Sequence, residues 1–543
     1  MKSEKNLFII IFIVFIAAAA VLLLRNNLGK GENSVNTENM TEQSADSDAL
    51  SETESNGEGV GQGTESVIEE EPEIYFDTKS PIVERFVENI GTSGADFMFL
   101  SMFPVRTFNE DVLYDQMLAV AEILEVPLDS GMQLIEVLET VLKKPNTLNK
   151  VFLGIHTEGV WEQRTRPLNL SYESELLQEG YSWEAALVEL AKRYPNITFE
   201  TVLYYPNINT LTSMDQETID GMADWYGYVA EILCQYEEVP NMHLFMPGCE
   251  EWLICNVDNY QDDMNLTVEV ADELERLILC TYQFMVTQEN VAEKCERLKQ
   301  LVHTYRENPI APQKQDCTYV FLGDSVIGNY SGSLSIPGVV SYMTGADAIN
   351  CGYGGLAATK MSEEKAGLQD VIDMLLNETP DRDESSIGNE NARRGIRQFW
   401  NAGFEKNTEK LAFFLSFGIN DYMSGLPVYN AANDISCYKG ALTKAVEDLQ
   451  NAFPNAKIVL MTPNLIARGD FGTVAYEKGS PYIEYIKAVF AIGEEKELDV
   501  IDIYGAVTFT ENEISKYLAD LCHPNYDFRF LIGKIIRDYV TDK

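Results

Sequence analysis

The residue types that could support chemistry begin in the stretch YVFLGDSVIGNY, residues 319–330. Its apolar run ends abruptly in Gly323, Asp324 and Ser325. Glycine, aspartate and serine are common turn formers, so one interpretation is an ordinary turn. The other is a serine nucleophile at the carboxyl end of a buried strand, which would need a neighbouring base to activate it. Histidine, the commonest base, occurs at only four positions, which are His156, His243, His303 and His523.

A base and a carboxylate lie close together near the C-terminus, in the segment LADLCHPNYDFRFLIGKIIRDYV. Asp520 and His523 are three residues apart, and Pro524 follows, which favours the first turn of a helix. The apolar residues after it recur at helical spacing and predict a terminal helix packed on a sheet. At this separation a carboxylate can reach the imidazole ring, fix its tautomer and stabilise the imidazolium. The sequence therefore predicts a nucleophile, base and orienting carboxylate in Ser325, His523 and Asp520.

The elements that must position these residues alternate along the C-terminal part of the chain. Short apolar runs bounded by turn signals predict strands, and amphipathic stretches between them, such as GALTKAVEDLQNAF, predict helices. This alternation is typical of a parallel sheet covered by helices on both faces. Three of the runs end in polar or glycine-rich turns, at residues 323–325, 352–355 and 418–421. Because ligands bind at the carboxyl ends of parallel strands, we expect these turns to meet at one edge of the sheet.

Four short motifs occur in this part of the chain in the order FLGDS, NCGYGG, SFGIND and DLCHP. With these motifs, residues 315–543 resemble the SGNH, or GDSL-type, serine hydrolases. The resemblance implies a three-layer α/β/α, flavodoxin-like fold. It also implies cleavage of ester bonds through an acyl-serine intermediate, without a cofactor or a metal ion.

The resemblance assigns a role to each motif residue. Ser325 would be the nucleophile, and His523 would be the general base and acid, oriented by Asp520. The backbone N–H groups of Ser325 and Gly355 would form an oxyanion hole together with the side-chain amide of Asn420. Such donors stabilise the negative charge that develops on the carbonyl oxygen of the substrate.

The N-terminus has a different character. Residues 7–24, LFIIIFIVFIAAAAVLLL, carry no charge, and as a helix they would span about 27 Å, enough to cross a bilayer core. Leucines and an arginine follow the alanines instead of a small-residue cleavage site, so we favour an uncleaved anchor over a cleaved signal peptide. Residues 1–6 are then predicted to be cytoplasmic, and the acidic, polar residues 25–74 to form a disordered stalk. We expect a single-pass protein of the cell membrane with extracytoplasmic C-terminal domains.

Residues 75–310 also alternate apolar and amphipathic stretches, which predicts a second α/β domain before the catalytic one. A faint internal repeat suggests a degenerate copy, since KRYPNITFETVLYYPNI resembles NAFPNAKIVLMTPNLI. In this alignment Phe103 replaces the serine, Glu158 the oxyanion asparagine and Asn265 the histidine. Such a domain would bind glycan or position the active domain. The alternative is that any two α/β domains share this periodicity.

Charge and cysteine content exclude some classes of partner. The chain has 40 basic and 86 acidic residues and a net charge of −46, which argues against nucleic acid or an anionic membrane surface as a partner. Its nine cysteines form no CxxC pair or Cys/His cluster, so the sequence predicts neither a disulfide framework nor a structural zinc site.

The function that these patterns favour is an extracytoplasmic, membrane-anchored serine esterase that removes acyl groups, foremost acetyl, from carbohydrate or related esters. One alternative uses the same residues. It is an O-acyltransferase in which a hydroxyl of a cell-surface polysaccharide, rather than water, captures the acyl-Ser325 intermediate. Another is a non-catalytic glycan-binding or assembly protein that only keeps the fold. The expected partners are an acylated carbohydrate or small ester substrate, and the membrane through the N-terminal helix.

Overall fold

The computed structural model describes residues 81–541, apart from 102–119, 125–127, 129, 157–173, 235–237, 263–264, 311, 313, 361–365, 378–389, 432–433 and 477. The chain divides into two compact units, Met1–Glu73 and Ile74–Lys543, and every described element belongs to the second. The predicted cytoplasmic segment 1–6 and anchor 7–24, and the predicted stalk 25–74, lie outside the described residues. Within the described ranges, no helix combines the length and the apolar character needed to cross a membrane.

The C-terminal region, residues 315–541, is built on a parallel sheet of five strands in the order β10-β9-β8-β6-β7. Its strands are β6 (Thr318–Gly323), β7 (Asp347–Asn350), β8 (Leu411–Ser416), β9 (Lys457–Met461) and β10 (Asp499–Ile501). They fall on the five predicted apolar runs, which confirms the predicted parallel α/β fold. All six residues of β8 are buried, as expected for a central strand covered on both faces.

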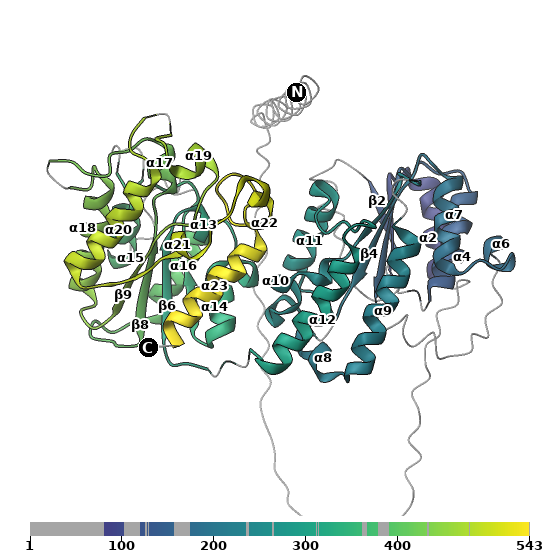
Figure 1. Cartoon of the computed structure of the whole chain (residues 1–543), viewed down its shortest axis with the longest axis horizontal. Coiled ribbons are helices and arrows are strands. Elements are labelled where there is room, and N and C mark those ends of the chain that lie inside the picture. The colour runs from purple at the N-terminus through teal and green to yellow at the C-terminus, as the bar shows by residue number, and fades with distance from the viewer. Residues whose placement is uncertain are drawn as a thin grey trace, which may run out of the picture. The chain divides into compact units, whose positions relative to one another are not determined.

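Helices cover both faces of this sheet. Figure 1 shows α18 (Tyr438–Ala452) and α20 (Tyr482–Lys496) on one side of the strands, and α14 (Ile336–Thr344) and α23 (Tyr526–Thr541) on the other. The apolar residues of α18 that were predicted at helical spacing are buried in the core. The other described helices of the region are α13 (Ser325–Gly328), η3 (Gly332–Leu334), α15 (Leu368–Asn377), α16 (Glu390–Ala402), α17 (Ile419–Met423), α19 (Arg468–Gly472), α21 (Ile503–Ala506), η4 (Glu511–Glu513) and α22 (Ile514–Tyr517).

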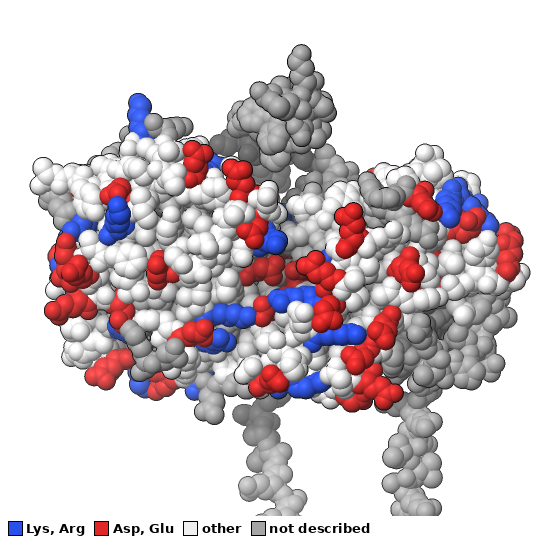
Figure 2. Space-filling view, viewed as in Figure 1, with Lys and Arg blue, Asp and Glu red and all other residues white. Residues whose placement is uncertain are grey.

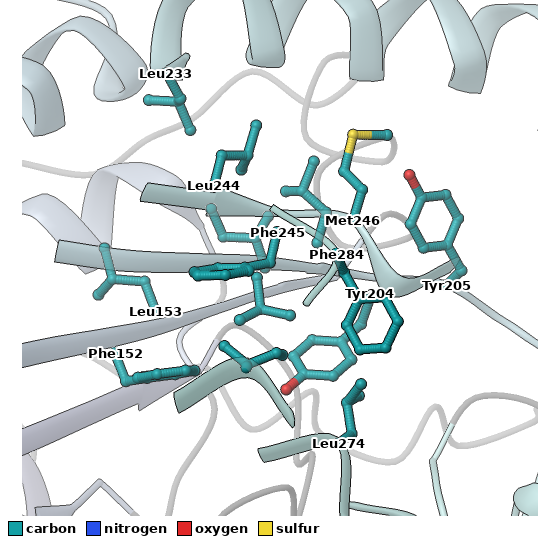
Figure 3. Close-up of a cluster of buried hydrophobic side chains, with 14 of the residues drawn as sticks. Phe152, Leu153, Tyr204, Tyr205, Leu233, Leu244, Phe245, Met246, Leu274 and Phe284 are labelled. Carbon is teal, nitrogen blue, oxygen red and sulfur yellow. The ribbon is translucent and has the colours of Figure 1, made fainter. Parts of the chain in front are cut away.

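The N-terminal region, residues 81–310, contains a second parallel sheet, in the order β2-β1-β3-β4-β5. Its strands are β1 (Phe97–Ser101), β2 (Ala121–Ile123), β3 (Lys150–His156), β4 (Thr198–Tyr204) and β5 (Met242–Phe245). Figure 3 shows its core, with Leu233 and Leu274 on opposite sides of the strands. The sheet is therefore covered on both faces, which agrees with the second α/β domain predicted for this region.

The helices of this region flank the sheet in the same way. In Figure 1, α11 (Val268–Thr281) lies on one side of the strands, and α4 (Gly131–Lys143), α7 (Trp183–Arg193) and α9 (Gln216–Leu233) lie on the other. The other described helices are α2 (Pro81–Ser93), α6 (Glu175–Gln178), α8 (Ile208–Ser213), η1 (Pro247–Cys249), α10 (Glu251–Ile254), η2 (Val257–Asn259) and α12 (Val291–Glu307).

The two sheets have the same strand order. In each, the strand that comes first in the chain lies between the second and the third, and the fourth and fifth follow the third. The correspondence is that of the predicted repeat, which pairs β1 with β6, β3 with β8 and β4 with β9. Of the three residues aligned to the active site, Phe103 and Glu158 lie outside the described residues. The duplication stays a prediction, and the common strand order agrees with it.

Asn265, the third aligned residue, lies in a loop built like the one around His523. Asp262 accepts hydrogen bonds from the Asn265 backbone N–H at 2.7 Å and from its side-chain amide at 2.8 Å. Asp520 bonds to the backbone N–H and ring of His523 at 2.8 and 2.7 Å. Each loop precedes a helix, α11 or α23. If the predicted repeat is right, Asn265 places an amide in the N-terminal region where the C-terminal region has an imidazole.

Charged side chains of both signs are interspersed over the face shown in Figure 2. Some form partly exposed ion pairs, such as Lys496 with Glu447 at 2.6 Å and Lys360 with Asp370 at 2.9 Å. Exposed pairs of this kind contribute little to stability. The large negative charge of the chain therefore bears on its association with charged partners more than on its fold.

Candidate active site

The nucleophile candidate Ser325 lies where β6 ends and the short helix α13 begins. Asp324 caps this helix, because its side chain accepts a hydrogen bond from the Val326 N–H at 3.0 Å. Gly323 lets the strand come close to its neighbours, since a Cβ at this position would lie 2.4 Å from the Ile327 side chain. The Gly-Asp-Ser motif therefore forms a tight strand-to-helix turn in which each residue has a separate structural reason.

The structure brings the three predicted catalytic residues together. Ser325 Oγ lies 2.8 Å from His523 Nε2, and His523 Nδ1 lies 2.7 Å from Asp520 Oδ2. The contact between Ser325 and His523 joins residues 198 positions apart in the chain. The arrangement allows His523 to accept the serine proton while Asp520 holds the ring and stabilises its charged form.

The loop that carries His523 is held by its own backbone and by a neighbouring loop. Asp520 Oδ1 accepts the N–H groups of Cys522 and His523 at 2.7 and 2.8 Å. The buried side chain of Asn464 donates to the Cys522 carbonyl at 3.0 Å. Asn464 was not predicted as a site residue, although the Pro-Asn pair that contains it stood out in the internal repeat. In the N-terminal region, Asn207 donates to the Asp262 carbonyl at 3.4 Å.

His523 and Asp520 stabilise each other's charged forms. The hydrogen bond to Asp520 raises the pKa of His523 to about 10 from the ordinary 6.5, and its contact with Cys522 adds to this. Burial acts to raise the pKa of Asp520. The hydrogen bonds from His523 and the Cys522 N–H outweigh it, so the Asp520 pKa lies well below its ordinary value. An imidazolium beside an ionised carboxylate is therefore the favoured state of the pair at neutral pH.

Asp324, next to the nucleophile, is a buried carboxyl group in a different electrostatic situation. Burial raises its pKa to about 7, which the Val326 N–H and the charge of His523 partly oppose. Its Oδ2 atom has no hydrogen-bond partner in the described part of the chain. Near neutral pH, both the protonated and the ionised form of the Asp324 carboxyl group are therefore expected beside Ser325, in the turn that begins α13.

The predicted oxyanion donors come from two further turns. Gly355 is in the left-handed region with φ +77°, and no atom of the described residues lies within 4 Å of the position that a Cβ would occupy. The Asn420 side-chain nitrogen, at the start of α17, donates to the Leu356 carbonyl at 3.1 Å. This bond ties the turn of Gly355 to Asn420 and uses one of the two amide hydrogens, so the other stays available for a substrate oxygen.

Asp421, which was not predicted as a site residue, fixes the segment that follows the turn of Gly355. Its fully buried carboxylate accepts hydrogen bonds from the N–H of Ala358 at 2.8 Å, and from the N–H and hydroxyl of Thr359 at 2.9 and 2.5 Å. Burial raises its pKa, which these three bonds oppose. The only sequence signal was its place beside Asn420 in the SFGIND motif.

One group of side chains in the described residues has atoms that could hold a metal ion, namely Asp520, Cys522 and His523, whose ligand atoms lie within 4.8 Å of one another. Cys522 Sγ lies 3.5 Å from His523 Nδ1. Two of the three residues already bond to each other as base and orienting carboxylate. This donor set is therefore best understood as part of the serine–histidine–aspartate arrangement.

One family model matches the part of the chain that contains these residues. Residues 321–527 match the model of the GDSL-like lipase/acylhydrolase family. This part of the chain is a GDSL-like domain, and the class of protein that the fold and the site define is a hydrolase acting on esters. A search of curated proteins found no match to the chain.

Several solved structures are similar to part of the chain. A member of the lipolytic G-D-S-L family from Veillonella parvula is 16% identical, covering 42% of this chain and 100% of that one, with a TM-score of 0.29. An arylesterase described as putative from Agrobacterium tumefaciens is 13% identical, covering 42% and 99%, with a TM-score of 0.28. A carbohydrate esterase family 2 enzyme from Corynascus thermopiles is 15% identical, covering 43% and 68%, with a TM-score of 0.28.

Proposed function

We propose that the protein is a membrane-anchored, extracytoplasmic serine esterase that removes acetyl groups from carbohydrate. The observation that carries the chemistry is the continuous hydrogen-bonded chain from Ser325 Oγ through His523 to Asp520, with distances of 2.8 and 2.7 Å. In the first step, Ser325 Oγ forms a bond to the carbonyl carbon of the ester, and its proton passes to His523 Nε2. His523 then gives that proton to the leaving sugar oxygen.

The second step releases the acyl group. Water attacks the acyl-Ser325 carbonyl, His523 accepts the proton of the water, and the proton returns to Ser325 Oγ as acetate leaves. In both steps the carbonyl oxygen becomes negatively charged. The N–H groups of Ser325 and Gly355 and the amide of Asn420 would donate to it. The bonds that fix the Gly355 turn to Asn420 and Asp421 support this role, because such donors act best when they are held in place beforehand.

Partial exposure of the base and its carboxylate is compatible with hydrolysis of an ester on a large substrate. The side chains of His523 and Asp520 are 31% and 50% exposed, whereas Ser325 itself is only 7% exposed. An ester must therefore bring its carbonyl group to a largely buried serine beside a partly exposed base. Water can approach the acyl-enzyme from the side of His523, which supports hydrolysis over transfer to a second sugar.

The membrane location rests on the sequence. The uncharged segment 7–24 is long enough for a bilayer core, and the acidic, polar residues 25–74 suit a solvated spacer. If this proposal is right, the protein stays in the membrane fraction under alkaline extraction. External protease then releases an active fragment that begins within residues 31–74. A secreted mature protein that starts after residue 24 would contradict it.

The decisive experiment measures acetate release from acetylated polysaccharide, with Ser325→Ala as the control. The expected result is steady acetate release that the substitution abolishes and that added acceptor sugar does not reduce. Acetyl transfer to the acceptor at the expense of free acetate would identify an acyltransferase. Binding of the polysaccharide without acetate release or transfer would identify a non-catalytic protein.

A further inference from the structure

Arg529, the fourth residue of α23, is a buried cation for which the described residues provide no carboxylate partner. Its side chain is 2% exposed, and Nε, Nη1 and Nη2 have no hydrogen-bond acceptor in the described part of the chain. Instead, Cζ lies 3.4 Å from the ring centroid of Tyr330 and 3.8 Å from that of Tyr526. A buried charge is costly unless something compensates it, and aromatic faces attract a guanidinium. Two tyrosine rings therefore hold this charge.

The two rings belong to the two segments that contain Ser325 and His523. Tyr330 follows Ser325 by five residues, just after α13, and Tyr526 follows His523 by three residues, at the start of α23. The rings contact each other edge to face, with centroids 5.5 Å apart and planes at 71°. Arg529 thus links the segment that follows Ser325 to the helix that follows His523.

The N-terminal region packs against both segments. Trp252 of α10 stacks on Tyr526, with centroids 4.5 Å apart and planes at 28°. Glu273 of α11 accepts a hydrogen bond from the Tyr526 hydroxyl. Glu269, one turn earlier, accepts one from the Ser331 hydroxyl at 2.5 Å. Tyr526 is also buried in the hydrophobic core of the N-terminal region.

We propose that the N-terminal region positions Ser325 and His523 through an aromatic–arginine cluster made of Trp252, Tyr330, Tyr526 and Arg529. The inference rests on the proposed function, because it concerns the same site. It gives the N-terminal region a role in supporting the active site of the other region. The helix that follows the loop of Asn265, α11, holds the catalytic segments of the other region.

The proposed role of the cluster is to hold Ser325 and His523 at the right distance from each other, without contact to the substrate. A displacement of about 1 Å in a catalytic group costs on the order of 10²-fold in rate. Loosening the cluster should therefore lower kcat and leave KM nearly unchanged, because the groups that would bind the substrate stay in place. A purely structural role predicts fewer folded molecules, each with normal kcat.

The test is Arg529→Met in the full-length protein, which keeps the length of the side chain and removes the charge. Active serines are counted by complete labelling with a phosphonate, and kcat and KM are measured on a small aryl acetate. The expected result is a fall in kcat per active serine of about 10- to 100-fold, a matching fall in labelling rate, and KM within about threefold. Trp252→Leu, in the N-terminal region, should act in the same direction.

Lys534→Met is the matched control. Lys534 lies on the same helix and pairs with Glu251 of the N-terminal region, outside the cluster. Its loss should lower the melting temperature without changing kcat per active serine. Normal kcat in both Arg529→Met and Trp252→Leu, or an equal fall in Lys534→Met, would overturn the proposal. If Arg529→Met does not fold, Trp252→Leu decides by the same criterion. Failure of the wild type to label at Ser325 would refute the proposed function instead.

Discussion

Replacing Asp520 by asparagine should lower kcat and shift the pH dependence of the reaction, and the hydrogen bonds of Asp520 explain both effects. An asparagine keeps an oxygen that can accept the N–H groups of Cys522 and His523, now bonded to Asp520 at 2.7 and 2.8 Å. The loop should therefore keep its shape. The amide would turn N–H donors toward His523 Nδ1, which then must accept, so the ring proton moves to Nε2. In this tautomer the ring cannot take the proton of Ser325, and kcat should fall by roughly 10⁴-fold.

The pH profile should move at the same time. In the wild type, the bond to Asp520 raises the pKa of His523 to about 10, so kcat/KM should rise with pH from neutral toward that value as the ring loses its proton. Without the carboxylate, the His523 pKa should fall toward the ordinary 6.5, and the rise should occur at correspondingly lower pH. Hydrolysis of an aryl acetate between pH 5 and about pH 10 measures both profiles. With only four histidines in the chain, NMR titration can follow the ring directly.

Stability provides an independent check of the same pair. A raised histidine pKa contributes stability that is fully present below the unfolded value of 6.5 and is lost as pH rises through about 10. The difference in free energy of unfolding between the wild type and Asp520→Asn should therefore be larger at pH 6 than at about pH 10. Coinciding pH–rate profiles of the two proteins, or a stability difference that does not depend on pH, would refute the reasoning.

Other substitutions test the remaining parts of the site. Ser325→Ala should lower turnover by roughly 10³- to 10⁶-fold and abolish phosphonate labelling, and full activity in the folded variant would contradict the nucleophile assignment. Asn420→Ala should cost roughly 10²- to 10³-fold in kcat with intact folding, and an unchanged kcat would remove it from the oxyanion hole. Asp421→Ala should lower the free energy of unfolding by roughly 3 kcal/mol or more in urea titration, because it leaves two buried N–H groups and a hydroxyl unbonded. Thr359→Ala should cost less, and equal losses would show that the backbone bonds contribute nothing.

Much of the C-terminal region could be predicted from the sequence because its signals are local. Continuous apolar runs mark the strands, and the turns after them contain residues that suit tight bends, as Gly323 does beside Ile327. Asp520 and His523 are three residues apart, so one loop sets their contact. The contact between Ser325 and His523, by contrast, depends on the fold, because the two residues are far apart in the chain. The parallel sheet supplies it, because it brings the carboxyl ends of distant strands to one edge.

Tertiary structure alone decided the features that depend on contacts between distant segments. No pattern in the sequence indicated that the Asp421 carboxylate would bond to Ala358 and Thr359, more than 60 residues away. Nor did the sequence show that Arg529 would lie between Tyr526 of its own helix and the distant Tyr330. Composition cannot reveal such pairs, because the partners of a buried charge are fixed only when helices and strands pack. The sequence determined the catalytic groups, and packing determined what holds them in place.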